Sequence, residues 1–79
     1  MERSAIKEKI IKMILDFVDE DIDITEDKEL MGELDLDSLD IIAMISDIED
    51  AFDISMTYED NRQVTTVGDI IDCIAKKIG

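Results

Sequence analysis

The chain has 79 residues, 46% hydrophobic and 4% aromatic, which predicts one small domain over residues 1–79 with an aliphatic core. Its 22 Asp and Glu against 8 Lys and Arg give a formal net charge of −14, which disfavours nucleic acid and anionic membranes as partners. One cysteine and no histidine exclude an internal disulfide, a Cys-His zinc set and a histidine-based catalytic triad. No apolar stretch approaches a membrane span, so a cytoplasmic protein without membrane insertion is expected.

The first predicted helix covers residues 4–18, because apolar residues recur there with helical spacing. Glu8, Lys9, Lys12 and Asp16 fall on the opposite face, toward water. The side chains expected to face the core are Ile6, Ile10, Met13, Ile14, Phe17 and Val18.

A long ordered loop is predicted next, since carboxylates accumulate over residues 19–27 and the helical period is lost up to residue 33. Its expected apolar anchors are Ile22 or Ile24, Leu30, Met31 and Leu34, with room for one helical turn near Leu30. Asp19, Asp21 and Asp23 have the spacing that opens a calcium-binding EF-hand loop. Ile24 and Leu30 replace the glycine and glutamate that such a loop needs, so no dedicated metal site is predicted, although loose binding of divalent cations stays open.

A second amphipathic helix is predicted over residues 38–52. Its expected apolar stripe consists of Leu39, Ile42, Ile45, Ile48 and Phe52. Outside that stripe lie the carboxylates Asp40, Asp47, Glu49 and Asp50. Such a row is either a solvated face or a surface that recognises basic partners.

Two capping boxes predict the remaining helices, because Thr57 is followed by Asp60 and Thr66 by Asp69. The first predicts one or two turns over residues 57–62, and the second a helix over residues 67–78. The inward residues of that last helix are Val67, Ile70, Ile71, Ile74 and Ile78, with Cys73 as a half-buried packing residue. The fold expected is an all-α, small four-helix bundle with three longer helices, one short helix and a long loop between the first two.

Ser38 places a hydroxyl at the start of the second predicted helix. The simplest interpretation is an N-cap, since serine is a preferred cap residue. Asp37 can cap the helix instead, with Asp40 in the first turn. A phosphate ester on Ser38 would then lie in the favourable field of a helix N-terminus.

The segment Asp37-Ser38-Leu39-Asp40 and the apolar and acidic positions that follow it resemble the acyl carrier proteins, whose Asp-Ser-Leu motif carries the serine that accepts 4′-phosphopantetheine. Residues 29–34 are similar to the loop before that serine, and residues 64–69 to the start of the family's last helix. The resemblance implies an up-down helical bundle with covalent 4′-phosphopantetheine on Ser38 and no catalytic activity of its own. The thiol of that group would carry acyl groups as thioesters between enzymes of fatty acid biosynthesis or related lipid metabolism.

The resemblance also implies the partners of a monomeric carrier: a phosphopantetheinyl transferase, and acyl-transferring and biosynthetic enzymes with basic patches. The residues expected to meet those patches are Asp37, Asp40, Asp47, Glu49 and Asp50. An acyl chain would be sheltered in a cleft between the second and last helices. Its candidate lining residues, for which core packing is an equally good explanation, are Ile41, Met44, Ile45 and Tyr58.

Three positions depart from the usual fatty-acid carrier: Asp35 replaces a glycine, Ala43 an acidic residue and Ser46 a methionine. A specialised aminoacyl, peptidyl or polyketide carrier of the same fold therefore stays open. A further alternative, from another functional class, is an acidic helical adaptor that binds basic proteins and uses Ser38 only as a cap.

Stability should depend on ionic strength, because a net charge of −14 produces strong self-repulsion in the compact state. We expect added NaCl or a divalent cation to raise the midpoint of thermal unfolding by screening the carboxylates, and low ionic strength to loosen the fold. Circular dichroism at constant pH and increasing salt measures this midpoint. A midpoint that stays constant or falls with added salt would contradict the expectation.

Overall fold

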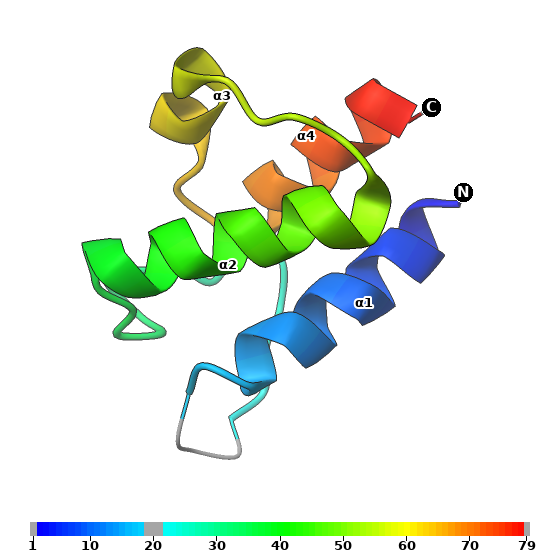
Figure 1. Ribbon diagram of the computed structural model, residues 1–79. Helices are drawn as coiled ribbons and strands as arrows, with labels where there is room; N and C mark the ends of the chain where they lie inside the picture. Colours follow the sequence, from blue (N-terminus) through cyan, green and yellow to red (C-terminus); the bar gives the residue numbers. More distant parts are fainter. Residues whose placement is uncertain (1, 19–21, 79) are drawn as a thin grey trace.

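The computed structural model describes residues 2–18 and 22–78. Within them lie four α-helices, α1 Arg3–Leu15, α2 Ser38–Phe52, α3 Tyr58–Gln63 and α4 Val67–Ile78 (Figure 1). The prediction of an all-α fold with three longer helices and one short one is confirmed. The ends of α2 and α4 match the predicted ones to the residue. None of these helices has the length and apolar character that crossing a bilayer requires.

Aliphatic side chains from α1, α2, α4 and the long loop form the core. α1 packs against both α4 and α2, and each of these three helices buries one face. The expected inward residues of α1 and α4 are confirmed as buried or half-buried. The clustered buried side chains are Ile6, Ile10, Ile14, Ile24, Leu30, Leu34, Leu36, Met44, Ile48, Phe52, Val67, Ile70, Ile71 and Ile74.

α1 ends at Leu15, three residues before its predicted end. The chain forms a tighter, 3₁₀-type turn there, because the Phe17 N–H donates to the Ile14 carbonyl oxygen, three residues earlier, at 2.9 Å. Acidic residues follow from Asp16 onward, and negative charge is unfavourable at a helix C-terminus. Phe17 and Val18 nevertheless pack half-buried against the core, as their spacing predicted.

The predicted apolar stripe of α2 is wrong in its first half, because Leu39 is 76% exposed and Ile42 is 66% exposed. The buried face begins at half-buried Ile41. It continues through Met44, Ile45, Ile48 and Phe52. This set follows the spacing i, i+3, i+4, i+7 and i+11, a better helical stripe than the predicted one.

The loop between α1 and α2 is ordered by backbone hydrogen bonds with the segment that precedes α4 and with the first turn of α4. The Leu30 N–H donates to the Thr65 carbonyl oxygen at 3.0 Å, and the Gly68 N–H donates to the Glu26 carbonyl oxygen at 2.9 Å. A Cβ atom on Gly68 would lie 3.1 Å from that same oxygen, so the close approach favours glycine.

The predicted loop anchors are confirmed with one exception. Ile24, Leu30 and Leu34 are buried and Ile22 is half-buried, whereas Met31 is 55% exposed. A single turn surrounds Leu30, where the Glu33 N–H donates to the Glu29 carbonyl oxygen at 3.0 Å, and this turn directs Met31 outward. The two carboxylates that began the comparison with a calcium loop, Asp19 and Asp21, lie outside the described residues.

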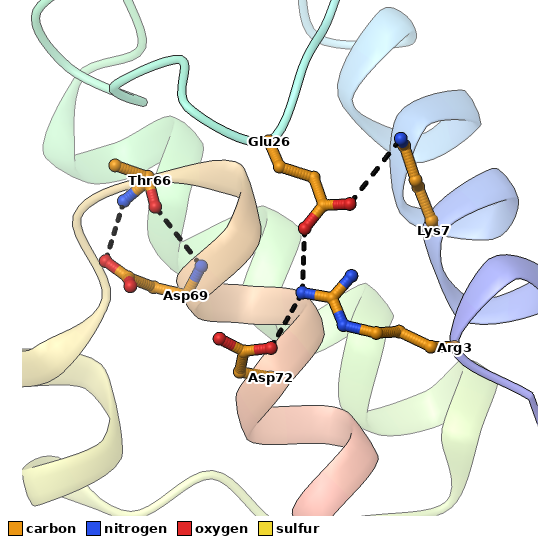
Figure 2. A network of polar contacts seen from close by, with 6 residues as sticks. All are labelled: Arg3, Lys7, Glu26, Thr66, Asp69 and Asp72. Atoms are coloured by element: carbon orange, nitrogen blue, oxygen red, sulfur yellow. Dashed lines mark hydrogen bonds and ion pairs between the residues drawn. The ribbon is translucent and has the colours of Figure 1, made fainter.

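Ion pairs join α1, the loop and α4 at one end of the bundle (Figure 2). The Arg3 guanidinium lies 2.7 Å from a carboxylate oxygen of Glu26 and 2.7 Å from one of Asp72, and Lys7 lies 3.5 Å from Glu26. The hydrogen bonds from Arg3 hold the pKa of Glu26 below its usual value. One cation thus bridges three segments that are distant in sequence.

α4 begins at the predicted capping box. The Thr66 N–H donates to the Asp69 carboxylate at 3.0 Å, and the Asp69 N–H donates to the Thr66 hydroxyl at 3.2 Å (Figure 2). The Thr65 N–H donates to the same carboxylate oxygen at 2.9 Å. These backbone N–H groups lower the pKa of Asp69, because they stabilise its ionised form.

α3 contributes no buried side chain and stands at the edge of the bundle (Figure 1). Its predicted capping box is present, since the Asp60 N–H donates to the Thr57 hydroxyl at 3.1 Å. The Lys77 ammonium, in the last turn of α4, lies 2.8 Å from the Asp60 carboxylate. That ammonium, together with the Thr57 N–H and hydroxyl, lowers the pKa of Asp60 to about 2. Local capping and one ion pair therefore hold α3.

The pairing of Lys77 with Asp60 predicts a pH-dependent contribution to stability. A carboxyl whose pKa is lowered on folding stabilises the fold above its unfolded pKa and loses that contribution as the pH falls through the folded pKa. We expect Lys77→Gln to lower the midpoint of thermal unfolding at pH 7. The difference from wild type should shrink between about pH 4 and the Asp60 pKa of about 2.

Lys76→Gln is the matched control. It changes the net charge equally and lies in the same helical turn, but Lys76 has no ion pair within residues 2–18 and 22–78. Scanning calorimetry at several pH values compares the two variants. If Lys77→Gln and Lys76→Gln lowered the midpoint of thermal unfolding equally at every pH, Lys77 would act only through net charge.

Candidate functional site

Ser38 is the first residue of α2, and it is exposed. Asp37, not Ser38, caps the helix: the Asp37 carboxylate accepts the Asp40 N–H at 2.8 Å, and the Asp40 carboxylate accepts the Asp37 N–H at 3.3 Å. The capping role predicted for Asp37 is thereby confirmed. The Ser38 hydroxyl is therefore not needed to begin the helix, and the residue is exposed at the helix N-terminus.

This position suits a phosphate ester. The first N–H groups of an α-helix have no intrahelical acceptor, and the macrodipole gives that end a partial positive charge. A phosphodiester oxygen on Ser38 could accept hydrogen bonds from this first turn. Because Ser38 is exposed and is not part of the core cluster, attachment of a large group there requires no rearrangement of the core.

Two exposed apolar side chains, Leu39 and Ile42, follow Ser38 on α2. Their spacing in the sequence predicts both in the core and therefore does not identify them as surface residues. A second apolar stripe, through Ile41, Met44 and Ile48, is the signal that could have identified them as exposed. Two offset stripes on one helix cannot both face the same core, so one of them must lie partly on the surface. The first turns of α2 therefore combine an exposed hydroxyl with exposed apolar surface.

The carboxylates of α2 differ in their surroundings. Asp47 and Asp50 are exposed, whereas half-buried Glu49 accepts the Met56 N–H at 2.9 Å and so ties α2 to the segment that leads to α3. Asp37 and Asp40 form the capping box. Glu49 thus makes a structural contact that its position in the predicted helix does not indicate.

None of the ion pairs within the described parts of the chain involves a carboxylate of α2. The basic residues of those pairs are bound to acidic residues of the long loop, α3 and α4. They are Arg3, Lys7, Lys28, Arg62 and Lys77. Within the described residues, no carboxylate of α2 is therefore neutralised by a direct ion pair.

The candidate cleft residues do not come together around one cavity. Met44 is fully buried in the core, Ile45 is 6% exposed and Tyr58 is 77% exposed. A cavity of about 120 Å³ lies between the loop, α2 and the segment before α4. Apart from Glu29, Gly32 and Thr65, it is lined by apolar side chains, those of Leu30, Met31, Ile41 and Val64. Of the residues expected at a cleft, Ile41 alone borders this cavity.

Cys73 is half-buried on α4, with its sulfur 3.8 Å from that of Met56. Burial raises the pKa of its thiol, so the unreactive protonated form is favoured. The predicted packing role fits this environment.

Comparison with known proteins agrees with this geometry. The family model described as "Phosphopantetheine attachment site" matches residues 8–74. The acyl carrier protein of Syntrophobacter fumaroxidans is 36% identical over 78 residues, which cover 96% of this chain and 95% of that protein. The acyl carrier protein of Thermotoga maritima is 31% identical over 80 residues, with 95% and 99% covered.

The fold is also similar to solved structures of acyl carrier proteins. A structure described as that of a candidate acyl carrier protein from Mycobacterium tuberculosis superposes with a TM-score of 0.85 at 32% identity and covers 90% of this chain and 96% of its own. A mitochondrial acyl carrier protein of Toxoplasma has a TM-score of 0.88 at 21% identity, with 99% and 92% covered, and supports the fold alone. With the family match over most of its length, this chain belongs to the acyl carrier proteins, which bear covalent 4′-phosphopantetheine and act as carriers without catalytic activity.

Proposed function

We propose that Ser38 is the residue that accepts 4′-phosphopantetheine. The observation that carries this proposal is that Ser38, the first residue of α2, is exposed at a helix start already capped by Asp37. A serine that served as the cap would instead direct its oxygen back to the N–H groups of the first turn. Here that contact belongs to Asp37, so Ser38 can be modified without loss of the cap.

The attachment gives this chain its carrier role. When bound, the group supplies a thiol at the end of a flexible tether, and that thiol holds an acyl group as a thioester. A tether raises the effective concentration of cargo at each partner to which the carrier is docked. The protein contributes the anchoring oxygen, the favourable field of the helix N-terminus and the surface that the partners recognise.

The partners of the family are a phosphopantetheinyl transferase and biosynthetic enzymes. We propose that they meet α2 through basic patches, attracted by Asp37, Asp40, Asp47, Glu49 and Asp50. Coenzyme A is itself anionic, so a chain with net charge −14 needs a cationic enzyme to bring the two together. Electrostatic contacts of this kind accelerate encounter more than they add affinity, which suits a monomeric carrier that must leave each enzyme. The proposed compartment is the cytoplasm.

Acyl cargo would enter the bundle near Ile41, which borders the 120 Å³ cavity and follows Ser38 by one helical turn. Met44 and Ile45 continue the same face of α2. A chain that penetrated beyond the cavity would therefore displace these two side chains. Tyr58, at 77% exposure, would contribute only at the rim.

The proposed cargo is that of fatty acid biosynthesis or a related pathway. Ala43 and Ser46, two of the departures from the usual fatty-acid carrier, are both exposed on α2. They alter the surface that partners meet and leave the core unchanged, which favours a specialised aminoacyl, peptidyl or polyketide carrier as the second candidate. Loading assays with enzymes that activate each type of acyl group separate the candidates.

Ser38→Ala should abolish attachment of the group while the fold persists. Since Asp37 forms the cap, the loss of stability should not exceed about 1 kcal/mol. Intact-mass measurement after incubation with coenzyme A, Mg²⁺ and a phosphopantetheinyl transferase detects the attachment, and circular dichroism measures stability.

Ser4→Ala is the control, because Ser4 is also an exposed serine in the first turn of a helix. It should gain one phosphopantetheine group, as the wild type does. No gain by the wild-type chain would favour the acidic adaptor instead. Global unfolding of Ser38→Ala would show that Ser38 is structural.

Neutralising the exposed acids of α2 should slow loading. We expect Asp47→Asn combined with Asp50→Asn to lower kcat/KM at low salt and to flatten its dependence on ionic strength, because fewer charges then steer the encounter. Glu8→Gln, an exposed carboxylate on α1, should behave like the wild type. Indistinguishable salt profiles for the double variant and the wild type would exclude these two residues from the docking surface.

A further inference from the structure

The cavity of about 120 Å³ beside α2 differs from two larger cavities in the chemistry of its walls. The larger ones, of about 240 Å³ and 390 Å³, are each lined by three acidic residues. These are Asp60, Asp69 and Asp72 in the first, and Glu33, Asp35 and Asp40 in the second. Glu29 is the one acidic residue among the described residues that line the smaller cavity. Because an apolar chain would take water away from the carboxylates, the smaller cavity is the most favourable of the three for an aliphatic group.

Backbone hydrogen bonds fix two walls of this small cavity. One wall is the turn over residues 29–32, and another consists of Val64 and Thr65, before α4. The Leu30 N–H donates to the Thr65 carbonyl oxygen at 3.0 Å, and the Leu36 N–H donates to the Leu30 carbonyl oxygen at 3.0 Å. The turn is thereby tied both to the segment before α4 and to the residues that lead into α2. These walls cannot separate without the loss of backbone hydrogen bonds, which is costly in a buried segment.

Ile41 supplies the third wall, from α2. Its helix is anchored in the core by Met44 and Ile48, both at 0% exposure. Because α2 cannot move away without losing that packing, the width of the cavity depends on the side chain at position 41. Ile41 follows Ser38 by three residues, a rise of about 4.5 Å along the helix axis. The cavity is therefore within reach of a flexible tether that begins at Ser38.

The cavity runs from the surface into the core, since among its lining residues Met31 is 55% exposed and Leu30 is 1% exposed. An apolar protein cavity of about 150 Å³ accommodates benzene, which has six carbons. By that measure, 120 Å³ holds about four or five carbons of a straight chain. A longer chain has to displace core side chains, and a close-packed interior resists added methylene groups.

We propose that this chain shelters short aliphatic acyl groups, of about four or five carbons, and that Ile41 is the specificity-determining residue that sets this length. The proposal rests on Ser38 being the attachment residue. The carbons of a short chain exchange water for the apolar walls of the cavity, which stabilises the loaded protein. Carbons beyond that length stay in water or displace core side chains, so they add no stability. The cargo class that follows is a short-chain acyl group rather than a long-chain fatty acyl group.

The test loads the chain with saturated straight-chain acyl groups of two to ten carbons. A phosphopantetheinyl transferase that accepts acyl-coenzyme A attaches each acylated phosphopantetheine, and intact mass identifies the product. The midpoint of urea unfolding is then compared with that of the protein that carries the free thiol. A group that binds only the folded state raises this midpoint. We expect the midpoint to rise up to about four or five carbons and then to level off or fall.

Ile41→Ala tests the role of Ile41, with Ile22→Ala as its matched control. Both substitutions remove the same three carbons from a half-buried isoleucine, but Ile22 lines the 390 Å³ cavity instead. In Ile41→Ala, the chain length at which the midpoint stops rising should increase by about three carbons, because the deleted atoms leave space of that size. In Ile22→Ala, this length should equal that of the wild type. Each variant is compared with its own free-thiol form, so that its loss of core packing cancels.

Ile41→Val is a milder variant for the case that Ile41→Ala does not fold. It removes one carbon, and the midpoint should stop rising about one carbon later than in the wild type. The same length limit in the wild type and both Ile41 variants would overturn the role of Ile41. So would a longer limit in Ile22→Ala, because the acyl group would then occupy the other cavity.

The wild-type series also tests the length limit directly. A midpoint that rises without interruption to ten carbons would overturn the limit, and a midpoint that is equal for all acyl groups and the free thiol would overturn the shelter itself. Both results would leave Ser38 as the attachment residue. Failure of the wild type to gain any mass would overturn the proposed function and this inference together.

Discussion

The reciprocal hydrogen bonds between Asp37 and Asp40 are the contact on which the site depends. They begin α2 without the adjacent serine, so one residue maintains the helix and the next is available for chemistry. One side chain cannot readily fill both roles, because a side chain that accepts an N–H of the first turn must fold back over the helix end. Ser38 does not have to make that contact, and it is exposed where the helix field favours a phosphate ester.

The small number of basic residues limits how many carboxylates can form ion pairs. With 8 basic residues against 22 acidic ones, the chain cannot neutralise its whole surface. Arg3 joins α1, the loop and α4, and Lys77 holds α3 against the end of α4. The second contact attaches α3, which buries no side chain, and the α2 carboxylates take part in neither ion pair. Within the described residues, the ion pairs thus neutralise carboxylates of the loop, α3 and α4 and none of α2.

Different apolar residues of α2 face the core and the surface. Met44, Ile48 and Phe52 pack inward, while Leu39 and Ile42 remain exposed beside acidic side chains. A surface with apolar groups surrounded by charge is typical of binding sites, because burial supplies affinity and charge supplies orientation and speed. Leu39 and Ile42 are therefore candidates for the docking surface proposed for α2, beside its carboxylates.

Local signals in the sequence determined where the helices begin, because a cap acts within three or four residues. Asp37, Thr57 and Thr66 were identified in this way, and the periods of α1 and α4 identified their buried faces. The resemblance carried by Asp37-Ser38-Leu39 identified the family and the candidate attachment residue.

Only the tertiary structure decided which of two apolar stripes on α2 would be buried, since that depends on where α1 and α4 lie. It also directed Met31 outward and made residue 35 left-handed, because the burial of Leu34 and Leu36 sets the path of the loop. Composition cannot reveal such features, because they arise from contacts between segments that are far apart along the chain.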